Sequence, residues 1–118
     1  APAATIVAGF SQGGALAAAM ALTQPNRVAG FAMFGGRLLP EVVARTADAS
    51  LDSIEAFIAH GRDDATLDVA WAHGAHRWLK AHGVPCELHL HDGGHALPQA
   101  MQRAFRAWFA GAERAWNH

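Results

Sequence analysis

Apolar residues gather in four short runs along the chain, and longer amphipathic stretches separate them. The first run contains the series Thr5-Ile6-Val7-Ala8. Each of the four runs is short and apolar, which is typical of strands inside a sheet. We therefore predict strands at about residues 4–10, 28–34, 54–60 and 84–91.

Helical patterns follow each predicted strand, at residues 12–23, 40–47, 66–82 and 98–115. Pro40 and Pro98 open two of them, where a proline in the first turn removes no helical hydrogen bond. The last two stretches carry apolar residues at spacings of three and four, which predicts faces packed on a sheet. These stripes are Leu67, Trp71, Ala75, Trp78 and Leu79 in one stretch and Met101, Phe105, Trp108, Phe109 and Ala112 in the other.

The alternation of strand and helix predicts an α/β fold with about four parallel strands flanked by helices. Right-handed crossovers place the functional loops of such a sheet at the carboxyl ends of its strands. A chain of 118 residues suits one core. No repeat or linker divides it, so we treat residues 1–118 as a single domain.

Composition narrows the possible partners. The chain is 52% hydrophobic with a formal net charge of −1 and no basic stripe, which argues against nucleic acid. Its longest apolar run, near residues 15–22, is too short to span a bilayer. Cys86 is the single cysteine, so no internal disulfide forms, and we expect a cytoplasmic protein in which this thiol is buried and structural.

Candidate chemistry begins at Gly9-Phe10-Ser11-Gln12-Gly13, a G-x-S-x-G run between the first strand and the first helix. A serine on such a turn has strained dihedrals, and glycines on either side let the chain pass closely. The turn presents the Ser11 hydroxyl at the strand end. The backbone N–H of Gln12 then supplies one donor of an oxyanion hole.

An acid and a base follow Ser11 at later strand ends, in the chain order that an α/β-hydrolase uses. His95, after Gly93-Gly94, can take the proton of the serine, and a carboxylate must orient that imidazole. Asp64 is our first choice for the carboxylate and Asp63 the second. This mechanism needs no cofactor.

The chain resembles the carboxylesterase/phospholipase family that includes the acyl-protein thioesterases, across essentially its whole length. The matching segments are Gly9-Phe10-Ser11-Gln12-Gly13-Gly14-Ala15, residues 25–30, Gly35-Gly36-Arg37-Leu38, His60-Gly61 with Asp64, and Gly94-His95. The resemblance implies a serine carboxylesterase that cleaves short-chain carboxylic esters or acyl thioesters through an acyl-enzyme, with Ser11, Asp64 and His95 as its triad. It covers only the C-terminal half of the family's domain, so the expected fold is a truncated α/β-hydrolase.

In the family that the chain resembles, earlier strands and an H-G loop with the second oxyanion donor precede the serine. Only ten residues precede Ser11 in this sequence, so we expect the chain to lack them. The strand at 4–10 would then be an open edge, which predicts a homodimer through that strand or association with a separate N-terminal piece. From loop position we expect the small ester substrate to contact Leu38, Leu67 and Leu97, although ordinary loop anchoring explains these leucines equally well.

Two other interpretations stay open. Glu87, His89 and His91 alternate along one strand face ahead of His95, which would suit a metal site if a converging ligand set existed. We expect no metal. Alternatively, the chain is a catalytically weak or inactive hydrolase that acts as a self-associating or binding module.

Overall fold

Four strands alternate with four helices in the computed structural model, which describes the backbone of residues 5–116 and the side chains of residues 5–113. The strands are β1 (Ile6–Phe10), β2 (Gly30–Phe34), β3 (Glu55–Gly61) and β4 (Cys86–His91). The helices are α1 (Gln12–Thr23), α2 (Pro40–Thr46), α3 (Ala70–Ala81) and α4 (Gln99–Trp116). All eight predicted elements are present, although Ala4 of the first predicted strand lies outside the described residues.

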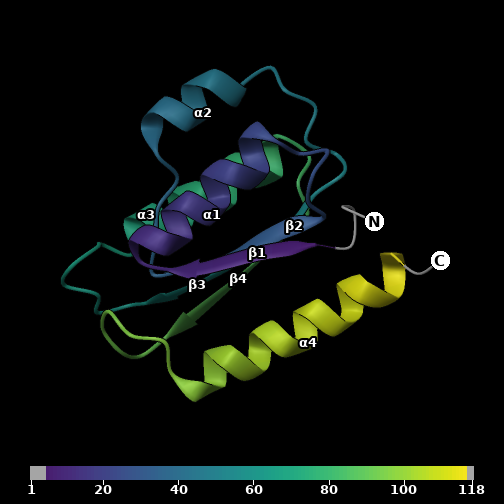
Figure 1. Cartoon of the computed structure of the whole chain (residues 1–118). Helices are drawn as coiled ribbons and strands as arrows, with labels where there is room; N and C mark the ends of the chain where they lie inside the picture. The colour runs from purple at the N-terminus through teal and green to yellow at the C-terminus, as the bar shows by residue number, and fades with distance from the viewer. Residues whose placement is uncertain (1–4, 117–118) are drawn as a thin grey trace.

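The strands form one parallel sheet in the order β1-β2-β3-β4, which confirms the predicted α/β fold. Each crossover steps to the next strand in the same direction, and right-handed connections then put α1, α2 and α3 on one face. Figure 1 shows these three helices on that face and α4 alone on the other. The carboxyl ends of all four strands therefore meet at one edge of the sheet.

The sheet separates two apolar clusters because successive side chains of a strand point to opposite faces. In β2, Phe31 and Met33 face α1, α2 and α3, while Ala32 and Phe34 face α4. The predicted α4 stripe packs there, with Met101, Trp108 and Ala112 buried. The two clusters fix the strand ends that carry the site.

Helix α3 begins at Ala70, four residues later than the sequence pattern predicts. The backbone N–H groups of Thr66 and Leu67 donate to Asp64 Oδ1 at 2.9 and 2.8 Å, and that of Ala70 donates to Asp68 Oδ1 at 2.8 Å. Two aspartates thus draw the segment into a loop before the helix can start. This loop becomes one wall of the candidate site.

Candidate active site

The predicted serine, acid and base follow three different strands and meet at the carboxyl edge of the sheet. Ser11 comes after β1, Asp64 after β3 and His95 after β4. Residues 84 positions apart in sequence are thereby within hydrogen-bond distance. Parallel topology explains the meeting, because every strand ends at the same edge.

Ser11 occupies a strained backbone conformation, with φ 58° and ψ −121°. It is the one non-glycine residue with positive φ in the described part of the chain. Such a conformation costs about 1–3 kcal/mol and persists where the surroundings enforce it. The Ser11 N–H donates to the Phe34 carbonyl at 2.7 Å, and the Ser11 carbonyl accepts from the N–H groups of Gly14 and Ala15. These bonds hold the hydroxyl at the turn.

Two glycines allow the turn to close, but they are not the pair that the motif suggested. A Cβ on Gly9 would collide with the Gly13 carbonyl, and a Cβ on Gly14 would lie 2.8 Å from the Gly9 oxygen. A Cβ on Gly13 would meet nothing within 4 Å. The close approach therefore requires glycine at positions 9 and 14, whereas position 13 has room for a side chain.

Ser11, His95 and Asp64 form a continuous chain of hydrogen bonds. Ser11 Oγ lies 2.8 Å from His95 Nε2, and His95 Nδ1 lies 2.7 Å from Asp64 Oδ2. A carboxylate only accepts, so the arrangement fits Nδ1–H donating to Asp64 while Nε2 accepts from the serine hydroxyl. This is the tautomer that a general base at Ser11 requires.

Asp64 is held ionised by its loop. Its side chain is fully buried, which raises the pKa, but hydrogen bonds from the Leu67 N–H, His95 and the Thr66 N–H outweigh burial and leave the pKa below 3.8. Asp63 is exposed, and its side chain takes no part in the chain of bonds. The structure therefore places Asp64, our first choice of acid, next to His95.

His60 lies buried beneath the acid loop. Its Nε2 atom is 2.7 Å from the Leu67 carbonyl and 3.4 Å from Asp64 Oδ2, so it ties the start of that loop to its end. Its Nδ1 atom has no hydrogen-bond partner among the described residues.

Close packing fixes the position of His95. A Cβ on Gly61 would collide with the carbonyls of Gly93 and Gly94, so glycine at the end of β3 lets the histidine loop approach. The Phe10 ring lies 4.9 Å from the imidazole, centroid to centroid. The base is therefore oriented by packing as well as by Asp64.

A pocket of about 220 Å³ opens beside the serine. Its lining residues are Ser11, Gln12, Ala15, Arg37, Leu39, Thr66 and Leu67. Gln12 begins α1, where the first N–H groups have no carbonyl partner within the helix. That leaves the Gln12 N–H suited to an oxyanion.

The three leucines expected to contact substrate lie in different places. Leu67 lines the serine pocket, and Leu38 lines a neighbouring apolar pocket. Leu97 packs against the cluster under α4 and lines neither pocket, so its contact with substrate stays a prediction. Sequence reasoning missed Arg37 and Thr66, whose place in the wall depends on how two loops face each other.

The histidines of β4 do not assemble into a metal site. His89 pairs with Glu87 at 2.9 Å, and His95 is engaged by Ser11 and Asp64. Across residues 5–113, no group of three or more His, Cys, Asp or Glu could hold a metal ion. The metal interpretation therefore has no ligand set in the described part of the chain.

Cys86 is not suited to nucleophilic chemistry. Burial, reinforced by the neighbouring Glu87, raises the pKa of its thiol from 9.0 to about 12. A protonated thiol is a poor nucleophile, which fits the predicted structural role, although Cys86 is partly and not fully buried as predicted.

No helix in the described residues is long and apolar enough to cross a membrane.

A four-stranded parallel sheet with serine, histidine and aspartate joined at its carboxyl edge defines the α/β-hydrolase class. The chain belongs to the phospholipase/carboxylesterase family, which it matches over residues 1–109. The predicted family is thereby confirmed.

Relatives and solved structures agree with this assignment. A probable carboxylesterase, SOBER1-like, of Arabidopsis thaliana is 32% identical over 105 residues, which are 86% of this chain and 40% of that protein. A probable carboxylesterase of Oryza sativa subsp. japonica is 30% identical over 109 residues, 91% of this chain and 46% of the relative. The chain thus spans less than half the length of these relatives.

The crystal structure of Arabidopsis thaliana SOBER1 matches with a TM-score of 0.83 at 24% identity. The match covers 95% of this chain and 54% of the SOBER1 chain. The Bacillus cereus carboxylesterase has a TM-score of 0.78 at 21% identity, covering 91% of this chain and 49% of its own. At these identities the similarity establishes the α/β-hydrolase fold.

Proposed function

We propose that the chain is a serine carboxylesterase that hydrolyses short-chain carboxylic esters or acyl thioesters, with Ser11, His95 and Asp64 as its catalytic triad. The observation that carries the proposal is the unbroken hydrogen-bond chain, 2.8 Å from Ser11 Oγ to His95 Nε2 and 2.7 Å from His95 Nδ1 to Asp64 Oδ2. Membership of the phospholipase/carboxylesterase family supports the same chemistry.

The reaction would proceed in two acyl transfers. Ser11 Oγ bonds to the carbonyl carbon as its proton passes to His95 Nε2, and His95 then protonates the leaving alcohol or thiol, giving an acyl-enzyme. Water repeats the attack with His95 again as base, which releases the carboxylic acid and restores Ser11. Asp64 stabilises the imidazolium throughout, because its low pKa keeps it charged.

Charge on the carbonyl oxygen would be stabilised by the Gln12 N–H. Losing one of two oxyanion donors typically costs about 10²–10³ in turnover. We therefore expect the Gln12 N–H to contribute a factor of that size to turnover.

Release of p-nitrophenol from p-nitrophenyl butyrate tests the proposal. We expect Ser11→Ala to abolish the release, while Ser53→Ala, which removes an exposed hydroxyl bonded only weakly to the Pro25 carbonyl, leaves it unchanged. Absence of hydrolysis above buffer by the unmutated chain would contradict the proposal. So would full activity in Ser11→Ala.

The exposed flank at β1 favours a second candidate, a self-associating hydrolase module of weak or no activity. β1 is an outer strand of the sheet, and Leu16 and Met20 on α1 are 60% and 41% exposed. They lie four residues apart and so share one helix face. Unpaired strand edges beside apolar surface are prone to join another chain.

We propose a homodimer in which two β1 strands pair antiparallel across a two-fold axis, which could bring a second oxyanion donor to each Ser11. Light scattering should give twice the mass of one chain, and Leu16→Glu with Met20→Glu should give a monomer. Ala81→Glu, on the exposed end of α3, is the control and should stay dimeric. A monomeric unmutated chain would overturn the dimer.

A cytoplasmic location would suit this function, because the single thiol at Cys86 needs no oxidising compartment. We also propose that residues 1–118 act as one α/β-hydrolase-like unit.

A further inference from the structure

Among the residues that the structure describes, one charged side chain lines the pocket beside Ser11, and it is a cation. This residue is Arg37, and the other six lining residues are uncharged. Gln12 and Thr66 add an amide and a hydroxyl, so every polar side chain in the lining can donate a hydrogen bond. The pocket therefore offers a positive charge and several donors to a group that binds next to the serine.

Arg37 has no anionic partner in the described part of the chain. Its guanidinium makes neither an ion pair nor a hydrogen bond with any side chain or backbone group of residues 5–113. The side chain is half-buried, and its five N–H donors are left to water or to a ligand. By contrast, Arg62 at the end of β3 pairs with Asp92 at 2.6 Å. The arginine at the pocket is thus the one available for an anion.

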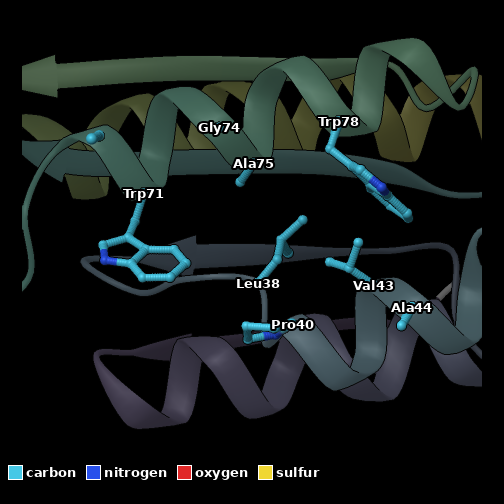
Figure 2. Close-up of a pocket in the computed structure, with 9 residues that line it drawn as sticks. Leu38, Pro40, Val43, Ala44, Trp71, Gly74, Ala75 and Trp78 are labelled. Carbon is cyan, nitrogen blue, oxygen red and sulfur yellow. The ribbon is translucent and has the colours of Figure 1, made fainter.

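The indole ring of Trp71 holds the Arg37 guanidinium in place. The guanidinium carbon lies 5.0 Å from the ring centre, and Trp71 is 39% exposed instead of packing in the core as its sequence stripe suggests. Figure 2 shows this ring at one end of a separate apolar pocket of about 350 Å³ between α2 and α3, whose walls include Leu38 and Gly74. An indole has no acceptor for N–H donors, so the contact orients the guanidinium without using them.

The carboxylate of the proposed triad does not serve as a partner for Arg37. The Asp64 side chain is fully buried and lies outside the lining of the pocket. Its Oδ1 atom accepts from the N–H groups of Thr66 and Leu67, and its Oδ2 atom lies 2.7 Å from His95 Nδ1. The negative charge is therefore engaged inside the protein, whereas the positive charge borders the pocket.

We propose that Arg37 selects esters that carry an ionised carboxylate close to the scissile ester group. The inference rests on the proposed esterase function and adds a substrate class, short half-esters of dicarboxylic acids and acylated hydroxy acids. A guanidinium binds a carboxylate through two parallel N–H···O bonds, which give direction as well as energy. The pocket volume, about 220 Å³, is below the range of sites for drug-sized ligands, so it has room for few atoms between the carboxylate and the carbonyl that Ser11 attacks.

Two pairs of esters separate the effect of charge from that of shape. Monomethyl succinate carries the carboxylate on the acyl side, and methyl levulinate replaces one carboxylate oxygen with a methyl group. Acetoxyacetate carries the carboxylate on the alcohol side, and acetoxyacetone is its neutral counterpart. The ratio of kcat/KM within each pair, measured as acid release at constant pH, reports the preference for charge. General damage to the site lowers both values and leaves the ratio unchanged.

Arg37→Gln removes the charge and keeps a polar side chain. We expect the unmutated chain to prefer the charged ester in at least one pair, and Arg37→Gln to lower that ratio at least about tenfold, because hydrogen bonds to charged groups are among the stronger ones. Arg37→Lys keeps the charge without the paired donors and should give an intermediate ratio. The pair that shows the preference identifies the side of the ester that carries the carboxylate.

Arg27→Gln is the matched control, because it removes the same charge from an exposed position before β2, at the opposite edge of the sheet. It should leave both ratios unchanged. Ratios that Arg37→Gln does not alter would overturn the proposal. So would an equal fall in Arg27→Gln, which would show that overall charge sets the preference.

Binding without turnover separates failure of the carboxylate site from failure of the esterase. The two charged esters are titrated into Ser11→Ala while tryptophan fluorescence is recorded, because Trp71 lies against Arg37. We expect a saturable change with at least one of them that disappears when Arg37→Gln is added. No saturable change, or the same change without Arg37, would overturn the carboxylate site even where esters are hydrolysed. Binding that depends on Arg37, without hydrolysis of any ester by the unmutated chain, would overturn the esterase alone.

Discussion

Two pockets border residues 37–40, and they are built from opposite kinds of contact. The pocket at Ser11 depends on directional hydrogen bonds, a buried carboxylate and a strained backbone. The pocket between α2 and α3 depends on volume and apolar surface. Hydrogen bonds lose strength steeply with angle and distance, whereas dispersion and burial tolerate exchange among apolar side chains. Single-atom changes should therefore disable the first pocket and only retune the second.

The largest expected effect comes from Asp64→Asn, which keeps the side-chain shape but removes the charge and the pure acceptor. The wrong imidazole tautomer is then favoured, and kcat should fall by about 10⁴-fold. Asp63→Asn, at the exposed neighbouring position, should retain activity. A greater loss in Asp63→Asn would reassign the acid and break the comparison.

Gly9→Ala and Gly13→Ala separate the strained turn from the helix that follows it. The methyl group at position 9 meets the Gly13 carbonyl, so we expect about 3 kcal/mol lower free energy of unfolding in urea. The methyl group at position 13 meets nothing within 4 Å and improves helix propensity, so stability should hold or rise. Equal losses in the two variants would contradict the packing of the turn.

The pH dependence of stability should distinguish the charged site from the apolar pocket. The folded-state pKa of Asp64 is below its unfolded value of 3.8, so its carboxylate contributes stability above pH 3.8 that is lost as the pH falls through the folded pKa. Asp64→Asn should flatten the stability profile in that acid window, measured by thermal unfolding. Gly74→Leu should leave the slope as it is, and a flattened slope there would argue against Asp64 as its source.

The smallest expected effect is at the contact between Arg37 and Trp71, where the guanidinium lies 5.0 Å from the centre of the indole ring. A cation–π pair at an exposed site contributes about 0.5–1 kcal/mol, so Trp71→Leu and Arg37→Gln should show a coupling of that size in a double-mutant cycle. Zero coupling in urea unfolding would show that the guanidinium and the indole are merely adjacent.

The fold could be predicted well from the sequence because local patterns and topology agree. Alternation of short apolar runs with amphipathic stretches predicts all eight elements, and the one clear shift, α3 beginning at Ala70, arises from side chains that bind backbone N–H groups. Periodicity does not register such bonds, since they depend on where one aspartate points.

The catalytic residues could be predicted from the sequence, whereas the apolar pocket between α2 and α3 could not. Ser11, Asp64 and His95 carry a motif and an order at strand ends, so their meeting could be expected from the sequence. The apolar pocket, with Trp71 turned outward, has no motif, because its shape depends on how α2 and α3 lie relative to each other. The role of Gly14 in place of Gly13 likewise needed backbone geometry.

The central claim is that His95, oriented by Asp64, activates Ser11, and covalent labelling tests it most directly. The intact chain is treated with a fluorophosphonate, whose fluoride leaves as the serine oxygen bonds to phosphorus, and the labelled peptide is identified by mass spectrometry. We predict one adduct on Ser11, with labelling slowed at least about a hundredfold in His95→Gln because the general base is gone. An adduct on another hydroxyl, or equally fast labelling of Ser11 without His95, would contradict the account.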